Sequence, residues 1–405
     1  MPSILVVTER YWPDPDDGGG ELATHLIINI LRKKFNVVVV TGTRSTSKAS
    51  GVEYIYEPLL SKREKPMLWM NTLRLINNQR FQKLLDKSDI VYIPSFAFPI
   101  IPFAKKLGKK VVVHLHGYIP ISYTATVLAP YEEHKHRIAI DDIGLECMKS
   151  IKHCIGVSLL WWLPKLARKW ISQADKILCV SRRHAEIIAD QMPELKDKIE
   201  VVYNPLPPEI INITPRKELD DISTFLYVGG DSYVKGFHIL LQALSKLSKQ
   251  GVKARFILAG EYKPRSLETI RQLCVKYRNL NIQVLNRVEY EKLRELHMKV
   301  WALLFPSISE ETFGYAVVEA SILGTIPIAS NVSVIQELLG DTAASKFLFT
   351  PNNYLELARK IVEVGSLSTG EVVSLGELIK KEISEKFSMS FIEREILETF
   401  NGILK

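Results

Sequence analysis

The strongest constraint on the fold is an alternation of short apolar runs with segments of helical periodicity. The runs are rich in Val, Ile and Leu, and they are continuous rather than alternating with polar residues. That pattern is typical of parallel β-strands covered by helices on both faces. The predicted strands are residues 3–8, 36–42, 89–94, 110–117, 176–181, 199–204, 224–230, 254–260, 282–288, 302–307 and 325–330.

Helical patterns fill the gaps between these runs, for example at 20–34, 237–247 and 290–300. The series pauses once, at 203–221, where four prolines occur without a clear period. We therefore predict a linker there, between two doubly wound α/β units of similar size. A length of 405 residues also exceeds one typical hydrophobic core. Ligands of such sheets bind beyond the carboxyl ends of the strands, so we expect the site in a cleft between the two units.

Charge and cysteine usage narrow the class of protein. The net charge of +8 favours anionic partners such as nucleotides, phosphorylated substrates or an acidic membrane, without choosing among them. The four cysteines show no Cys-x-x-Cys pair or zinc spacing, and disulfides are not expected; a Cys147–Cys154 bridge is possible but has no support from the sequence. The first residues predict a strand rather than a signal peptide, and the apolar run at 155–163 is shorter than the roughly 20 residues that span a bilayer. We expect a cytoplasmic protein.

Several polar and glycine residues follow predicted strands. Three glycines open a helix in the loop 16–25, where exposed backbone N–H groups attract anions, although a simple tight turn has the same pattern. The acidic run 14–17 suggests a metal site only weakly. His116 ends a strand and is a candidate hydrogen-bond donor, whereas His114 is expected to pack in the core. Lys235 precedes a helix without P-loop spacing and is a candidate phosphate ligand, or else a surface lysine.

Two glutamates eight residues apart, Glu311 and Glu319, frame the stretch 310–321. Glu311 follows the strand 302–307 and therefore lies at the ligand-binding edge of the second sheet. Glu319 falls inside a helix whose other residues are mostly apolar, so its carboxylate needs N–H or hydroxyl donors. A surface helix would carry several charges. The pair therefore favours a ligand site.

Taken together, these motifs resemble the retaining glycosyltransferases of family 4, which have the GT-B fold. The resemblance spans nearly the whole chain in order. It rests on the glycine loop 18–21, His116-Gly117, "ADKILCVS", "VVYNPL", "YVGGDSYVKG", "GTIPIASNVSVIQEL" and, most specifically, "FPSISEETFGYAVVEAS" with its Glu-x7-Glu element. The fold it implies has two Rossmann-like domains facing a central cleft. We expect an N-terminal acceptor domain at 1–205, completed by a helix at 388–405, and a donor domain at 206–387.

The resemblance also implies roles for individual residues. Glu319 would accept hydrogen bonds from the ribose of a nucleotide sugar, and Glu311 would lie near the donor sugar. Lys235 would neutralise the diphosphate, and His116 would contact the sugar near the reacting carbon. The remaining donor-binding residues would act mainly through their backbone or beside the base, and they are Gly19, Gly20, Gly229, Gly230, Arg287, Val288, Phe313, Gly314 and Tyr315.

The chain departs from the family at Gly230, where the family usually has an arginine that shares the charge of the diphosphate. This departure would mean weaker donor binding, replacement by another cation, or lost activity. Arg10, Arg182 and Arg287 are the candidate replacements. The alternatives to an active transferase are therefore a non-catalytic sugar-nucleotide-binding subunit and, from the shared architecture, a sugar-nucleotide epimerase.

The activity implied is the transfer of a hexose from a UDP- or GDP-sugar, with retention, to a glycan, lipid-linked or other acceptor. No cofactor or metal is expected, because fixed cations and N–H groups can stabilise the leaving diphosphate. No nucleic-acid partner is expected, since that would leave Glu311 and Glu319 unexplained. The segments 158–170 and 67–85 combine aromatic or apolar residues with bases, which suggests peripheral contact with the inner face of a membrane, or else core packing with bases reaching to solvent.

Overall fold

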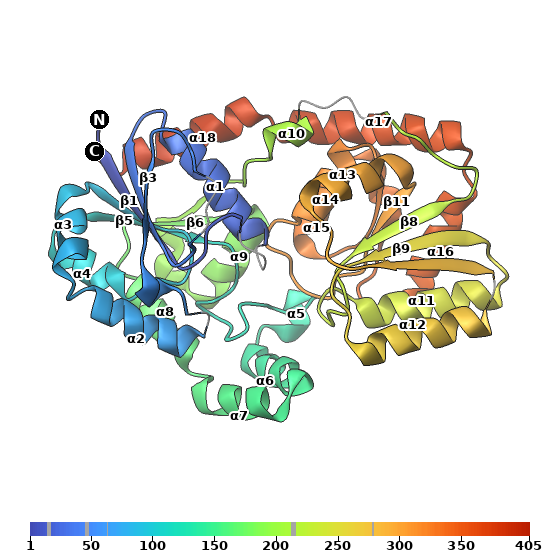
Figure 1. The fold of residues 1–405 in the computed structure, drawn as a ribbon, viewed down its shortest axis with the longest axis horizontal. Helices are drawn as coiled ribbons and strands as arrows, with labels where there is room; N and C mark the ends of the chain where they lie inside the picture. Colours follow the sequence, from blue (N-terminus) through green and yellow to red (C-terminus); the bar gives the residue numbers. More distant parts are fainter. Residues whose placement is uncertain (14–17, 45–47, 63, 212–215, 278) are drawn as a thin grey trace. The chain divides into compact units, whose positions relative to one another are not determined.

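The computed structural model describes residues 1–13, 18–44, 48–62, 64–211, 216–277 and 279–405. The chain divides into two compact units. Unit 1 comprises 1–127, 135–207 and 388–405, and unit 2 comprises 128–134 and 208–387. Each contains one fully parallel sheet covered by helices (Figure 1). The α/β class predicted from the continuous apolar runs is therefore confirmed.

The sheet of unit 1 has seven strands in the order β3-β2-β1-β4-β5-β6-β7. Their Val, Ile and Leu side chains are almost all buried, as both-face coverage requires. The strands are β1 (Ser3–Thr8), β2 (Asn36–Thr41), β3 (Glu53–Tyr56), β4 (Ile90–Ile93), β5 (Lys110–Leu115), β6 (Lys176–Cys179) and β7 (Ile199–Val201). The helices are α1 (Gly19–Leu31), α2 (Lys65–Leu75), α3 (Gln79–Lys87), α4 (Ile100–Lys106), α6 (Ile138–Lys149), α7 (Ile151–Leu160), α8 (Leu163–Ile171), α9 (Arg182–Gln191) and α18 (Met389–Gly402).

Unit 2 repeats the same plan with six strands in the order β10-β9-β8-β11-β12-β13. The strands are β8 (Thr224–Val228), β9 (Ala254–Ala259), β10 (Leu280–Leu285), β11 (Ala302–Phe305), β12 (Ile326–Ser330) and β13 (Leu348–Phe349). The helices are α5 (Tyr131–His134), α10 (Pro208–Ile211), α11 (Phe237–Lys249), α12 (Pro264–Lys276), α13 (Tyr290–Lys299), α14 (Tyr315–Ile322), α15 (Ser333–Leu339), α16 (Tyr354–Gly365) and α17 (Thr369–Lys386).

The C-terminal helix α18 packs in unit 1 beside α1 (Figure 1). Phe400 contacts the rings of Phe35 and Tyr92, with centroids 6.4 and 5.2 Å apart, and it is fully buried. Lys33, in the turn that follows α1, forms an ion pair with Glu393 of α18 at 2.7 Å. The last residues of the chain therefore complete the core that the first residues begin.

The division of the chain differs from the expected one at residues 128–134, which the strand series assigned to the first domain. This short segment, called the strap below, belongs to unit 2. Its backbone forms a bridge between Leu128 and Ser309, and the N–H of Ala129 donates to the carbonyl of Ile308 at 2.8 Å. The N–H of Tyr131 donates to the Glu310 carboxylate at 2.7 Å. These hydrogen bonds hold the strap on unit 2, and Tyr131 is buried although it begins a charged sequence.

A second correction concerns cysteines. Cys147 and Cys154 form a disulfide, which composition alone argued against. The reason is local geometry: α6 ends at Lys149, and Ser150 caps α7 at once by accepting the His153 N–H, so the chain reverses. The two Cα atoms thereby come within 4.0 Å. Cys179 is buried in β6, and burial raises the pKa of its thiol, as expected for an unreactive cysteine.

Candidate functional site

Each sheet has one point at which the strand order reverses direction. In unit 1 it lies between β1 and β4, and in unit 2 between β8 and β11. The loops that leave the carboxyl ends of such neighbouring strands diverge, and they open a crevice in which α/β proteins bind ligands. Glu9 and Ser95 follow the first pair of strands closely, and Gly229 and Ser307 follow the second. Both units thus present polar groups at equivalent places.

In unit 2 the two loops at this point pack backbone against backbone. Gly236 has φ of +75°, and a Cβ there would lie 1.7 Å from the carbonyl oxygen of Pro306. Only glycine fits this approach. The N–H of Ile308 donates to the carbonyl of Val234 at 2.9 Å. The glycine before α11 therefore fixes the loop of Lys235 against the loop of Glu311.

Lys235 and Glu311 form an ion pair in this crevice, with Nζ 2.9 and 3.1 Å from the two carboxylate oxygens. Ser307 and Ser309 donate to the same carboxylate, at 2.6 and 3.3 Å. Burial alone would raise the pKa of Glu311, but the charge and hydrogen bond of Lys235 and the two serine hydroxyls outweigh it and hold the pKa below its usual value. Glu311 is therefore ionised, and it orients the lysine ammonium at the edge of the sheet.

Glu319 lies in α14, the helix that follows the loop of Glu311, and it is buried. Its carboxylate accepts a hydrogen bond from the Tyr290 hydroxyl at 2.8 Å. Burial raises the pKa of Glu319 to about 7, although the Tyr290 hydrogen bond opposes the shift. The expected hydroxyl donor therefore exists, and it comes from α13. With a pKa near neutrality, this carboxylate is ready to be stabilised by further donors from a ligand.

The residues between these glutamates begin α14. Gly314 has φ of +81° at the N-cap, a conformation that favours glycine. The side chain of Phe313 is buried against Tyr315 and Phe387, with ring centroids 4.8 and 5.8 Å away. Phe313 therefore anchors the loop through its ring, so only its backbone is left to meet a ligand. Tyr315 is half-buried, and loss of solvent around its hydroxyl, with a smaller contribution from the Glu319 charge, raises its pKa.

The structure explains why arginine is absent at 230. Gly230 has φ of +57°, and a Cβ would lie 2.4 Å from the carbonyl oxygen of Glu261. Both Gly229 and Gly230 direct their N–H groups to the carbonyl of Ala259, at 3.2 and 3.3 Å. No side chain fits this backbone without rearrangement. Of the three arginines considered as replacements, only Arg287 belongs to unit 2.

Arg287 and Val288 lie between β10 and α13, just before Tyr290. Since Tyr290 reaches Glu319, this segment runs past the buried end of the proposed ribose site. Arg287 is exposed and Val288 is half-buried. The structure thus brings the segment of Arg287 into the same unit and neighbourhood as Glu319.

In unit 1, Gly20 and His116 are brought together. A Cβ on Gly20 would lie 3.2 Å from Cβ of His116, so the first turn of α1 passes closely over the histidine. Gly19 is the first residue of that helix. Burial lowers the pKa of His116 to about 4, so its ring is neutral at pH 7. His114 is fully buried and accepts from or donates to Tyr92 at 2.9 Å, as expected for a core histidine.

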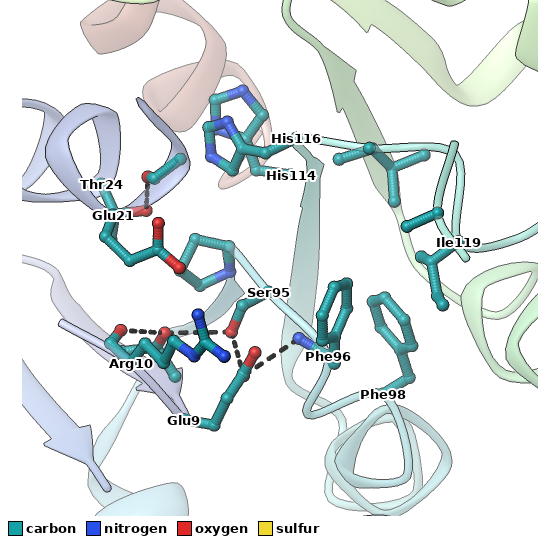
Figure 2. Close-up of a pocket in the computed structure, with 16 residues that line it drawn as sticks. Glu9, Arg10, Glu21, Thr24, Ser95, Phe96, Phe98, His114, His116 and Ile119 are labelled. Atoms are coloured by element: carbon teal, nitrogen blue, oxygen red, sulfur yellow. Dashed lines mark hydrogen bonds between the residues drawn. The ribbon is translucent and has the colours of Figure 1, made fainter. Parts of the chain in front are cut away.

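A cavity of about 220 Å³ opens beside these residues, entirely within unit 1 (Figure 2). Figure 2 shows Glu9, Arg10 and Glu21 along one side and the rings of Phe96 and Phe98 on the other, with the histidines above. One wall is thus charged and the other apolar. The cavity is lined by Thr8, Glu9, Arg10, Gly20, Glu21, Thr24, Pro94, Ser95, Phe96, Phe98, His114, Leu115, His116, Gly117, Ile119 and Ala125.

Glu9 is the acidic group of this cavity that is held most firmly. Its carboxylate accepts hydrogen bonds from the Ser95 hydroxyl and, at 3.1 Å, from the Phe96 N–H. Burial raises the pKa of Glu9 in spite of these donors, and the nearby charge of Glu21 adds to the shift. A buried carboxyl group and a neutral histidine that line the same cavity can each bind hydroxyl groups.

Sequence reasoning missed Glu9, Ser95 and Tyr290. The first two follow predicted strands directly, so the rule that ligands bind at carboxyl ends would have identified them. Tyr290 carried no such signal, because it contacts Glu319, which lies 29 residues further along the chain in another helix. The acidic run 14–17 lies outside the described residues. In the described part of the chain, no three His, Cys, Asp or Glu side chains gather where a metal ion could bind.

Comparison with known proteins agrees with this arrangement. Residues 17–210 match the family described as Glycosyltransferase Family 4, and residues 212–370 match Glycosyl transferases group 1. The chain belongs to this family of GT-B glycosyltransferases.

Two curated relatives and one solved structure show the range of similar proteins. The chain is 27% identical over 176 residues to the phosphatidylinositol N-acetylglucosaminyltransferase gpi3 subunit of Schizosaccharomyces pombe. The aligned region covers 43% of this chain and 38% of the relative. The chain is 26% identical over 241 residues to the uncharacterized glycosyltransferase MJ1607 of Methanocaldococcus jannaschii, covering 56% and 60%. The similarity therefore spans less than two thirds of each relative. Anabaena HepE in complex with UDP-glucose superposes with a TM-score of 0.70 over 99% of this chain and all of that one, at 16% identity, which shows a shared fold.

Proposed function

We propose that this protein transfers a hexose from a UDP- or GDP-sugar to a glycan, lipid-linked or other acceptor, with retention of configuration. The proposal rests on two groups in unit 2, near the point between β8 and β11 where the strand order reverses. There Lys235 is oriented by the partly buried Glu311, and a buried carboxylate, Glu319, has a pKa near 7. An ammonium group for a diphosphate and a carboxylate for ribose hydroxyls are the groups that a nucleotide sugar requires.

In this proposal Lys235 stabilises the negative charge that develops on the leaving diphosphate. An ammonium group fixed before the reaction does so without reorganisation. The N–H groups of Gly314 and Tyr315, at the start of α14, add the positive end of a helix. Gly19 and Gly20 leave the start of α1 free of side chains, and His116, neutral at pH 7, meets the sugar as a hydrogen-bonding group. Arg287 and Val288 lie beside the base.

We assign the cavity of unit 1 to the acceptor. Glu9, Ser95 and His116 offer hydrogen bonds to sugar-like hydroxyl groups, and Phe96 and Phe98 offer an apolar wall to the rest of the molecule. The relatives and the solved structures include proteins named for different acceptors, so the acceptor is proposed only as a hydroxylated molecule with an apolar part. We propose that the protein is cytoplasmic and acts peripherally at the inner face of a membrane.

The test is a thermal-shift screen of the purified protein against UDP-, GDP- and ADP-sugars. A ligand that binds only the folded state raises the melting temperature by mass action and needs no known acceptor. We expect stabilisation by a UDP- or GDP-sugar in the wild type and a smaller shift in Glu319→Ala. An absence of any shift, with the fold intact, would contradict the proposal.

A second candidate is a sugar-nucleotide-binding subunit without catalytic activity. The backbone at Gly230, which excludes the family's arginine, favours this alternative. It predicts donor binding without donor turnover, even when a cell extract supplies acceptors. Release of nucleoside diphosphate above background would reject it. A sugar-nucleotide epimerase would instead isomerise a free UDP-sugar, which chromatography of the donor after incubation would detect.

A further inference from the structure

An apolar stripe on α7 has no covering element among the described residues of the chain. Ile151, Ile155 and Leu159 are 81%, 57% and 69% exposed. They are spaced at i, i+4 and i+8, so they lie on one face of the helix. Met148 at the end of α6 and the adjacent Trp161 and Trp162 extend the exposed apolar surface at both ends. These six residues are called the α7 surface. Monomeric proteins seldom leave such side chains grouped together.

The sequence segment that contains the α7 surface carries charges of one sign. From Cys147 to Ala174 the chain contains five Lys or Arg and no Asp or Glu. Two of these bases are paired with acids outside the segment, Lys149 with Glu146 and Arg168 with Glu194. Lys152, Lys165 and Lys169 form no ion pair with any carboxylate that the structure describes, and all three are exposed. An apolar face flanked by exposed lysines complements an anionic lipid surface.

The tryptophans support a lipid interface rather than a buried position. Trp161 and Trp162 are both nearly half exposed, and the Lys165 ammonium lies 4.9 Å from the centre of the Trp161 ring. Rings with one polar edge settle at the level of lipid headgroups. By contrast, Leu163, Pro164 and Ala167 of α8 are buried in unit 1, so the apolar face of α8 is not available to lipid and only its lysines are exposed.

The helix pair α6–α7 is also built as a firm projection. The two helices reverse at Ser150, and the Cys147–Cys154 disulfide joins them next to the turn (Figure 1). The residues at the tip, Met148 and Ile151, are therefore held together rather than on a free loop. No helix in the described residues is long and apolar enough to cross a bilayer. An interfacial contact needs only one apolar face.

We infer that the α7 surface docks the protein on an anionic lipid bilayer, with Ile151, Ile155 and Leu159 entering the headgroup region and Lys152, Lys165 and Lys169 above it. This inference names the surface for the membrane contact proposed above. It does not depend on donor binding, because binding to vesicles is measured without any glycosyl transfer.

The experiment is flotation of the full chain with vesicles of phosphatidylcholine, with or without phosphatidylglycerol. We expect binding to the anionic vesicles and about tenfold or greater weakening in the double variant Ile151→Glu, Ile155→Glu. Lys152→Gln with Lys165→Gln should remove the preference for the anionic lipid and the dependence on salt. The matched control is Val275→Glu, which changes a side chain of similar exposure, 75%, on α12 of unit 2 and should leave binding unchanged.

A second readout locates the contact. Brominated lipids should quench part of the tryptophan fluorescence of the wild type, and the variant Trp161→Phe, Trp162→Phe should lose that part. Equal vesicle binding by wild type and the Ile151→Glu, Ile155→Glu variant would overturn the inference. So would a change of oligomeric mass in that variant without a change in vesicle binding, since the surface would then join two copies of the chain. If the variant keeps its thermal-shift response to nucleotide sugars, donor binding does not depend on the α7 surface.

Discussion

Glu319 combines burial, a single protein donor and a pKa near 7, and this combination makes its ligand binding depend on pH. In the proposed function, ribose hydroxyls donate to the ionised carboxylate, so a nucleotide sugar should bind mainly the ionised form. Between about pH 6 and about pH 8 the ionised fraction rises about tenfold, and affinity should rise by a similar factor. Isothermal titration calorimetry at several pH values checks this. Glu319→Gln should bind weakly at every pH, and a wild-type profile that stays flat would argue against the ribose role.

The same carboxylate affects stability with the opposite dependence on pH. Its folded pKa of about 7 lies above the ordinary value of 4.5, so the folded state binds the proton more tightly. The stabilising effect is complete below about pH 4.5 and is lost as the pH rises through 7. Glu319→Gln should therefore melt higher than the wild type above pH 7 and lose this advantage towards pH 5. Melting curves across this range check the sign.

Lys235 is expected to matter more for turnover than for stability. Lys235→Ala removes the cation for the diphosphate, and turnover should fall by about a hundredfold, the usual cost of losing one group that stabilises the transition state. Removing the partner also leaves Glu311 buried beside two serines, which should raise its pKa and lower the melting temperature modestly. The control is Lys292→Ala, which breaks an exposed pair with Glu295 and should change neither quantity. Comparable activity of Lys235→Ala and wild type would refute the role.

At the scale of elements, the backbone of the loop at Gly230 has a conformation that suits glycine and leaves no space for a side chain. Gly230→Arg, which restores the residue usual in the family, should destabilise the protein rather than improve it. A side chain at φ of +57° and 2.4 Å from a carbonyl oxygen costs on the order of 1–3 kcal/mol or more. Urea unfolding measures this cost. Gly370→Ala is the matched control, since a Cβ there meets nothing within 4 Å and the position lies in α17, so it should be neutral or slightly stabilising.

A substitution at the contact of the strap, residues 128–134, tests what holds this short element on unit 2. Glu310→Ala removes the acceptor of the Tyr131 N–H, which is buried, and an unsatisfied buried donor costs about 1–3 kcal/mol. We expect faster amide exchange and earlier proteolysis within 128–134, with little change at β8 or β9. Equal protection of the strap in wild type and variant would show that its other contacts suffice.

The elements also show what the sequence can predict. Apolar runs located β1 without error and β2, β9 and β11 to within a residue or two at their ends, because buried parallel strands carry a nearly continuous apolar signal. Most predicted runs extend too far at the carboxyl end. The extra residues, such as His116, Gly229 and Ser307, leave the sheet to form the candidate sites. The short strands β3 and β13 were missed because they lie at sheet edges, where β3 is half exposed and β13 has only two residues.

The site residues were likewise predictable where local sequence marks them, and not where a long-range contact places them. Glu311, Lys235 and Gly314 were predictable because a strand end or a helix start marks each of them. The ion pair of Lys235 with Glu311, 76 residues away, was not predictable, since it depends on the close contact of Gly236 with Pro306. The disulfide and the strap were missed for the same reason: each depends on where a reversal or a long-range hydrogen bond places the chain.

For the whole molecule, α18 provides a test of the assembly of unit 1. Deleting 388–405 uncovers Phe35 and Tyr92 and breaks the pair of Lys33 with Glu393. Because several buried rings lose their partner, we expect the unfolding transition of unit 1 to shift to markedly lower temperature while that of unit 2 persists. Differential scanning calorimetry of the deletion variant checks this. The milder variant Phe400→Ala should shift the same transition in the same direction, at a cost of about 3–5 kcal/mol.

The strap has a consequence for any attempt to take the molecule apart. The chain passes between the units at 127–128, 134–135, 207–208 and 387–388. A fragment that ends at 207 therefore carries the strap without the residues that hold it, and it lacks the helix that closes its own core. In the proposed function unit 2 binds the donor, so a chimera built to exchange donor specificity with a relative has to move 128–134 together with 208–387. Unit 2 is thus encoded by two separate segments of the sequence. A junction placed only at the proline-rich linker would leave the seven residues of the strap from one protein against a unit 2 from the other.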